Sequence, residues 1–206
     1  SVLEKYPDSE LKNQAQMELA LVYKKQSDLA AAVRSLETID SAWPQWGKVQ
    51  IELADLYLSL NNDKKAEEVL NRALGGVEDG QLQSQLHYTK GKIQFSRYQD
   101  YRGAIANFDS SLALAPPEQL YNSTLFSRGA AYYELAKSQD ASGDSTRART
   151  SYAASIDDMK DLLQRNPSPN LKDSAFRTLG AGMIRLGQGQ EAAQYYEQLI
   201  NDTPDP

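Results

Sequence analysis

Residue types that commonly carry out catalysis are scarce in this chain of 206 residues. Cysteine is absent, which excludes disulfides, thiol catalysis and cysteine-based metal sites. His87 is the only histidine, so neither a Ser-His-Asp arrangement nor a multi-histidine metal site is expected. Carboxylate pairs such as Glu67 with Glu68 and Asp157 with Asp158 occupy adjacent positions of expected helices, where they point apart and lie on solvated faces. The sequence therefore predicts a protein that is not an enzyme and that has no cofactor or metal site.

Other signals exclude further classes of function. The run Gly187-Gln188-Gly189-Gln190 lies between two expected helices rather than after a strand, so it is a turn and not a phosphate-binding loop. The formal net charge of -6, with no basic run, argues against nucleic acid or an anionic membrane surface as a partner. No apolar stretch approaches the roughly 20 residues of a membrane span, and no signal peptide is visible. We expect no nucleic-acid binding and no direct membrane insertion of this segment.

The elements that organise the chain are repeated at an interval of 34 residues. The matched pairs are Leu19 with Leu53, Ala20 with Ala54, Tyr23 with Tyr57, Ala32 with Ala66, and Leu36 with Leu70. A repeat of this length is a pair of helices. Small residues let two antiparallel helices approach closely, and the large apolar residues fill the space beside them.

Less regular copies continue the series. The third copy carries Gly91, Ala104, Phe108 and Pro116, with one extra residue in its turn, and the fifth carries Gly180, Ala192, Tyr196, Leu199 and Pro204. At these residues the chain resembles the tetratricopeptide repeat (TPR) family, and the resemblance covers nearly the whole chain. It implies an all-α fold: a right-handed superhelix, or α-solenoid, of about five helix-turn-helix repeats. The family's tryptophan position holds other residues here, among them Gln50 and His87, and we expect His87 to pack between repeats.

We expect one continuous array. Residues 1–12 are interpreted as the end of a preceding repeat, so the chain is expected to be a fragment of a longer protein. In residues 75–80 a glycine-rich turn replaces the usual proline, and either a bend or an ordinary loop is expected there. The five predicted repeats are residues 13–46, 47–80, 84–118, 122–169 and 173–206.

The fourth copy is 14 residues longer than a normal repeat. Fourteen residues correspond to about two extra turns on each of two helices, so an elongated hairpin is predicted. Gly143 is expected to end the first of these helices, and the residues after it are expected to cap the second. A rival register pairs Ala148 with Tyr152 but leaves Pro167 unexplained. The extension is read either as a partner-contacting protrusion or as a tolerated insertion with no role in binding.

The resemblance also implies a protein-binding surface. In TPR proteins the first helix of each repeat lines the concave side, and the corresponding positions here are mostly large and apolar. They predict an apolar groove with its anchor near Tyr88, Phe95, Phe126 and Tyr133, although packing against the facing second helix would also explain such side chains. The predicted groove residues are Met17, Leu21, Ile51, Asp55, Leu58, Tyr88, Lys92, Phe95, Phe126, Tyr133, Arg177 and Ile184.

The predicted function is a non-enzymatic protein-protein interaction scaffold that holds a peptide or helix in this groove. The alternative is a structural or assembly module that self-associates, or stacks on other domains, through the ends of the solenoid. Protein or peptide partners are expected in either case. The tyrosine-rich repeats and missing cysteines resemble bacterial envelope TPR proteins, which favours a periplasmic or envelope location, while a cytoplasmic scaffold fits the composition equally well.

Overall fold

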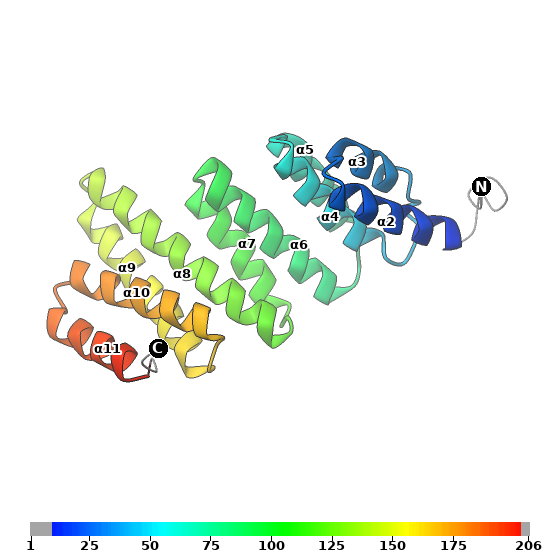
Figure 1. Cartoon of the computed structure of the whole chain (residues 1–206). Helices are drawn as coiled ribbons and strands as arrows, with labels where there is room; N and C mark the ends of the chain where they lie inside the picture. Colours follow the sequence, from blue (N-terminus) through cyan, green and yellow to red (C-terminus); the bar gives the residue numbers. More distant parts are fainter. Residues whose placement is uncertain (1–9, 203–206) are drawn as a thin grey trace. The chain divides into compact units, whose positions relative to one another are not determined.

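The computed structural model describes residues 10–202 of the chain, which form α-helices joined by short turns (Figure 1). No β-strand occurs in this range. The helices are α2 (Glu10–Lys25), α3 (Leu29–Glu37), α4 (Trp46–Ser59), α5 (Asp63–Gly76), α6 (Gly80–Ile93), α7 (Tyr101–Ala113), α8 (Glu118–Ala141), α9 (Ser145–Gln164), α10 (Pro169–Arg185) and α11 (Gly189–Asp202), with a π-helical segment η1 (Gln94–Tyr98) after α6. The predicted all-α fold of about five helix pairs is confirmed.

Contacts divide the chain into two compact units, residues 1–86 and 87–206, and each is described by itself. The first unit holds α2 to α5 with the start of α6, and the second holds the remaining helices. The first helices of the five pairs begin between one and four residues before the predicted repeat starts. Gly75 and Gly76 are helical, so the turn predicted over residues 75–80 is confined to 77–79. The single continuous array stays a prediction.

Parts of three predictions fall outside what the structure describes. The expected end of a preceding repeat lies mainly in residues 1–9, and only the beginning of α2 at Glu10 is described. Pro204 and the side chain of Leu199 are also outside the description. Within residues 10–202 no helix has both the length and the apolar character needed to cross a membrane.

The turn inside each of the first four pairs has the same construction. One residue takes a positive φ, namely Ser27, Asn61, Gln99 or Gly143, and an Asp or Asn follows it. The side chains of Asp28, Asn62, Asp100 and Asp144 then accept a hydrogen bond from the backbone N–H three residues later. Because each such bond satisfies an amide that the helix leaves unpaired, these residues determine where the second helices α3, α5, α7 and α9 begin. The predicted ending of α8 at Gly143, with a cap directly after it, is confirmed.

The two helices of each pair cross closely because the first helix carries a small residue at the crossing and the second helix carries a large one. In the first two pairs, Ala20 with Leu36 and Ala54 with Leu70 hold these positions and are buried. In the third pair, a Cβ atom on Gly91 would lie only 2.7 Å from Cε1 of Phe108. In the fifth pair a Cβ atom on Gly180 would lie even closer to Cζ of Tyr196. In these two pairs the first helix thus carries glycine instead of alanine and the second helix carries an aromatic residue instead of leucine, as close packing requires.

The extra residue of the third copy lies in a helix rather than in the turn where it was predicted. Gly91 and Phe108 are separated by one position more than Ala20 and Leu36. The segment η1 is π-helical, and a π-helical turn takes up one additional residue while the chain stays helical. The turn that follows, Gln99 and Asp100, matches the turns of the neighbouring pairs. The π-helix therefore restores the register of the crossing.

The predicted elongated hairpin of the fourth copy is confirmed. Helix α8 has 24 residues and α9 has 20, compared with 17 and 14 for α10 and α11 beside them (Figure 1). Gly129 meets Met159 thirty positions later, which is the normal sixteen plus the fourteen inserted. Nearer the tip, Ala136, Ala148 and Tyr152 are also buried together and repeat the spacing of Ala20, Ala32 and Leu36. The register of Gly129 with Met159 and the rival register of Ala148 with Tyr152 are therefore both present as buried contacts in one hairpin.

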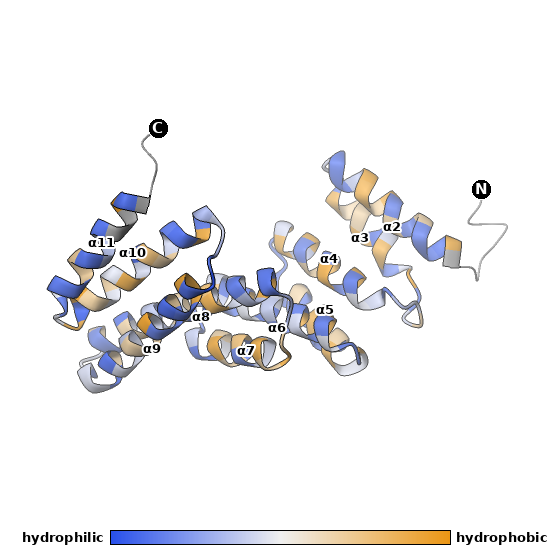
Figure 2. Cartoon of the chain, turned by 90° about the horizontal axis from the view of Figure 1, so that it is seen from below, coloured by the Kyte–Doolittle hydropathy of each residue, from blue (hydrophilic) through white to orange (hydrophobic). Residues whose placement is uncertain are grey.

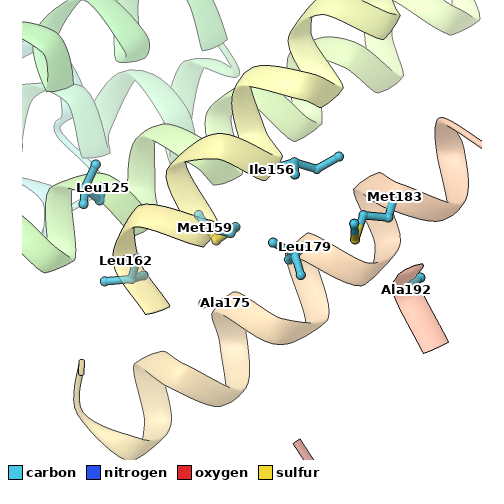
Figure 3. Packing of buried hydrophobic residues seen from close by; sticks show 8 residues of the cluster. All are labelled: Leu125, Ile156, Met159, Leu162, Ala175, Leu179, Met183 and Ala192. Carbon is cyan, nitrogen blue, oxygen red and sulfur yellow. The ribbon is translucent and has the colours of Figure 1, made fainter. Parts of the chain in front are cut away.

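The main core of the second unit lies between α8, α9 and α10. Figure 3 shows Met159 of α9 and Leu179 of α10 pointing toward one another, with Leu125 contributed by α8. Figure 2 shows that hydrophobic and hydrophilic residues alternate along the helices, the pattern of amphipathic helices with one packed face. The helix pairs of the second unit therefore bury their apolar sides against one another.

Replacement of Tyr152, which is almost fully buried near the hairpin tip, tests whether that outer half is stably packed. Tyr152→Ala should lower the free energy of unfolding by about 3 kcal/mol, because it leaves a cavity against Ala136 and Ala148. The exposed Tyr98 provides a control, and Tyr98→Ala should change stability by about 0.5 kcal/mol or less. Urea unfolding followed by circular dichroism measures both values. Equal costs for the two variants would contradict a packed tip.

Candidate protein-binding surface

Five of the predicted groove residues lie in the first unit, on α2 and α4. Met17 and Leu21 line a small hollow with Leu56 of α4, and Leu21 remains 39% exposed. An ion pair of 3.0 Å between Lys24 Nζ and Glu52 Oε2 joins the same two helices. Asp55 is exposed and Leu58 is half-buried. Ile51 is only 7% exposed, so it belongs to the core rather than to an open surface.

Three predicted residues belong to the third helix pair and pack largely within it. The ring of Tyr88 lies 6.0 Å from that of Phe108, and Lys92 Nζ lies 5.4 Å from the centre of the Tyr88 ring. Phe95 lies 5.7 Å from Tyr101. These aromatic side chains are half-buried, so each presents only part of its surface to a ligand.

The last four predicted residues lie on α8 and α10. Phe126 packs at the margin of the core around Leu125, and the ring of Tyr133 lies edge-on to Tyr152 at 5.5 Å. Arg177 is exposed, with its Nε 3.0 Å from Asp173 Oδ2. Ile184 is 57% exposed. The aromatic residues are thus partly core, while Leu21, Ile184 and Arg177 are open to a partner.

A polar hollow of about 610 Å³ lies on the same helices, at the N-terminal turns of α8 and α10. Its walls carry amide and hydroxyl side chains, including Gln119, Asn122, Ser123 and Asn170, and Glu118 is the one charged residue among them. Asn122 is one helical turn before Phe126, so the hollow borders the predicted surface. This hollow was not predicted from the sequence, because its residues follow no repeat pattern.

A second hollow, of about 550 Å³, lies in the first unit and is lined by α3, α4 and α5. Gln50, at the family's tryptophan position, contributes to its wall and is buried. The hydroxyl of Tyr57 donates a hydrogen bond to Glu37 Oε1 beside it, and Lys65 Nζ lies 5.2 Å from the Tyr57 ring centre. Burial and the Glu37 carboxylate raise the pKa of Tyr57 to about 12, so the phenol stays protonated and keeps this bond.

A charged network joins three helices of the second unit. Arg128 of α8 donates from Nε and Nη2 to the carboxylate of Asp158 in α9, at 2.9 and 2.6 Å, and from Nη1 to Asp109 in α7 at 2.6 Å. Burial raises the pKa of Asp158, although Arg128 acts in the opposite direction. Burial alone would lower the pKa of Arg128, but the two carboxylates raise it above its usual value, and the guanidinium remains charged. The network holds helices together and shows no catalytic geometry.

One interpretation made from the sequence is wrong here. Asp158 was expected on a solvated face, but it is 6% exposed and bound by Arg128, while its neighbour Asp157 is exposed. The burial of Asp158 could have been predicted from its position directly before Met159, the residue that meets Gly129. His87 is half-buried, and its Nδ1 lies 3.0 Å from Asn107 Oδ1 in the same helix pair, while its predicted packing between repeats stays a prediction.

No group of three residues in the described part of the chain has the types and placement to hold a metal ion. The arrangement of short antiparallel helix pairs, each crossing at a small residue, defines a repeat protein of the α-solenoid class.

The tetratricopeptide repeat model matches residues 23–87, and this match confirms the resemblance seen in the sequence. The matched residues run from the end of α2 into α6 and include the second helix pair. Residues 23–87 thus match the tetratricopeptide repeat, a family whose members are typically non-enzymatic interaction scaffolds. A search of curated proteins finds no match.

Solved structures of MamA have the same fold. A structure titled MamA AMB-1 is 16% identical, with a TM-score of 0.64, and the alignment covers 95% of this chain and 96% of that one. MamA 41-end from Desulfovibrio magneticus RS-1 is 15% identical, with a TM-score of 0.64 and coverage of 92% and 94%. A further crystal structure of MamA protein is 18% identical, with a TM-score of 0.58 and coverage of 92% and 91%. These similarities establish the fold.

The variant Arg128→Met should lower the free energy of unfolding by about 3 kcal/mol at pH 7, because it leaves the buried Asp158 carboxylate without its cation. Without Arg128, burial holds the pKa of Asp158 above its unfolded value. The folded variant then binds more protons than the unfolded one as pH rises through that interval, and its stability falls. The loss should therefore be smaller near pH 4 than at pH 7.

Urea unfolding of the variant at both pH values measures this difference, and the unmodified protein at the same pH values is the reference. The double variant Arg128→Met/Asp158→Asn should regain part of the loss at pH 7, since the carboxylate is removed. A loss that is independent of pH and unaffected by Asp158→Asn would contradict the role given to the ion pair.

Proposed function

We propose that this chain is a non-enzymatic scaffold that binds a peptide or helix of a partner protein on the first-helix face of its units. The family supports the general role, since tetratricopeptide repeats mediate protein-protein interaction. The observation that carries the finer proposal is the exposure of large apolar side chains at predicted ligand positions. Leu21 on α2 and Ile184 on α10 are the main examples. Such side chains, bordered by polar groups, are typical anchor sites for an amphipathic segment.

The packing of the aromatic residues changes which positions carry the proposal. Tyr88 and Tyr133 contact Phe108 and Tyr152 of their own pairs, so truncating them would disturb the fold as well as the surface. Ile184 makes a cleaner test, because more than half of its side chain is exposed. Arg177 lies two turns before it on the same helix and supplies a polar contact near this anchor.

A library of displayed peptides selected on the purified chain provides ligands of known sequence. Binding of the selected peptides, measured by fluorescence anisotropy, should weaken at least tenfold in Ile184→Asp, because a carboxylate cannot be buried against an apolar anchor without cost. Ile200→Asp is the matched control, since Ile200 is 71% exposed but lies on the second helix α11. Equal affinity of the two variants and the original chain would contradict the proposed surface on the second unit.

Self-association is the second candidate function. Leu11 on α2 and Ile200 on α11 are 60% and 71% exposed, and each lies on the outermost described helix of its unit. Apolar residues on such helices can stack on a further helix pair of another copy. Sedimentation velocity over a hundredfold range of concentration should then show dimers that are lost in Ile200→Asp and kept in Ile184→Asp. A monomer at every concentration would contradict this candidate and leave the peptide-binding proposal intact.

A further inference from the structure

The hollow of about 550 Å³ in the first unit has one face of α4 as its floor, and its walls are the end of α3 and one side of α5. The floor residues recur every three or four positions along α4 and are Trp46, Gln50, Leu53 and Tyr57. The predicted groove residues of the same helix, Ile51, Asp55 and Leu58, do not line this hollow. The hollow is therefore separate from the proposed peptide-binding surface.

Gln50 in the floor is a buried polar side chain without a partner. It is 3% exposed and makes no hydrogen bond to any described residue. Of its two amide atoms only Oε1 is fully covered, so Nε2 is the atom that can meet a ligand in the hollow. Buried polar groups are nearly always hydrogen-bonded in folded proteins. An acceptor placed in the hollow would supply the bond that Nε2 lacks.

Arg72 of α5 stands level with Gln50. The two helices are antiparallel, and Lys65 Nζ of α5 lies 5.2 Å from the ring centre of Tyr57 in α4. Two helical turns back from Tyr57 is Gln50, and two turns forward from Lys65 is Arg72. Arg72 lines the hollow, is exposed, and forms no ion pair with a described residue. A guanidinium and an amide N–H are thus two donors at one level of the hollow.

The charges on the walls leave one carboxylate and one guanidinium without a counter-charge. Glu37 and Lys65 both contact Tyr57, the first as acceptor of its hydroxyl and the second over its ring, so they offset one another. Glu68 also lines the hollow one turn before Arg72, yet it forms no ion pair with Arg72 or any other described residue. Beyond burial and Glu37, Arg72 lowers and Glu68 raises the pKa of Tyr57, so both charges lie near that buried hydroxyl.

This pair of opposite charges determines the type of ligand. An anion alone would be repelled by Glu68, and a cation alone by Arg72. A small zwitterion complements both, because its two charges face the two residues of opposite sign. An α-amino acid carries an ammonium and a carboxylate on one carbon atom, and its side chain would rest on the apolar lining that includes Leu53 and Val69.

We propose that this hollow binds a free α-amino acid with an apolar side chain, whose carboxylate accepts from Gln50 Nε2 and Arg72 and whose ammonium faces Glu68. The carboxylate then receives charge-assisted hydrogen bonds, which are the stronger kind. The inference is independent of the proposed function, since it concerns another face of α4 and a ligand of another class. Because the ligand contacts only the folded hollow, it should also raise the midpoint of thermal unfolding.

The test uses Trp46 as a reporter, since it is half-buried in the floor and Trp43 is the only other tryptophan. L-leucine and L-phenylalanine are titrated into the full chain carrying Trp43→Phe, and the tryptophan fluorescence should change in a saturable way. N-acetyl-L-leucine and L-leucinamide each lack one of the two charges and should bind about tenfold more weakly or less. Isothermal titration calorimetry on the unmodified chain repeats the comparison.

Variants at exposed positions of α5 provide the second arm. Arg72→Gln and Glu68→Gln should each weaken leucine binding by about tenfold or more, because each removes one charge contact. Lys64→Gln is the matched control, since Lys64 is exposed on the same helix and does not line the hollow. Circular dichroism establishes that the variants are folded. No saturable change with either amino acid, equal binding of the two single-charge probes, or unchanged affinity in Arg72→Gln and Glu68→Gln would each overturn the inference.

This proposal and the proposed function fail separately. Ile184 lies in the second unit, so leucine binding that is lost in Arg72→Gln and kept in Ile184→Asp would support the hollow whatever the selected peptides do. Selected peptides that depend on Ile184, together with no saturable binding of either amino acid, would overturn the hollow alone.

Discussion

The close approach of two helices at one small residue is the constraint on which the rest of this structure depends. Where the small residue is alanine, in the first two pairs, leucine lies opposite, and where it is glycine the partner is Phe108, Met159 or Tyr196. The combined volume at the crossing is therefore kept roughly constant while its two members vary. A tightly crossed pair buries its apolar faces, and this leaves the remaining faces of the first helices available to a partner.

Irregular features of the chain preserve this crossing. The π-helical segment after α6 takes up one surplus residue, so that Gly91 still meets Phe108. The long hairpin adds whole turns to both helices, so Gly129 meets Met159 and a second buried set forms around Tyr152. Arg128, the residue before that glycine, reaches Asp158, the residue before Met159, only because the two helices are close there. The insertion thus preserves the crossing, and the ion pair depends on it.

Much of this architecture could be predicted from the sequence because the crossing residues are local and repeated. The spacing of Ala20 and Leu36 recurs, and the turns of the first four pairs each carry an Asp or Asn helix cap. The binding surface was harder to predict, since the residue type at a position such as Ile51 or Tyr88 does not say which side chain is taken up by the neighbouring helix. The polar hollow at the N-terminal turns of α8 and α10 was not predictable at all, because its residues follow no repeat pattern.

A double-mutant cycle at Gly91 and Phe108 tests the central claim most directly, with the free energy of unfolding measured by urea titration for all four proteins. Gly91→Ala introduces a Cβ against the Phe108 ring, and Phe108→Leu opens space there, so each single change should cost about 1–3 kcal/mol. The double variant recreates the alanine-leucine combination of the first two pairs. It should lose less than the sum of the two, with a coupling energy of about 1 kcal/mol or more. Additive losses would contradict the claim that the two residues are matched in size across the crossing.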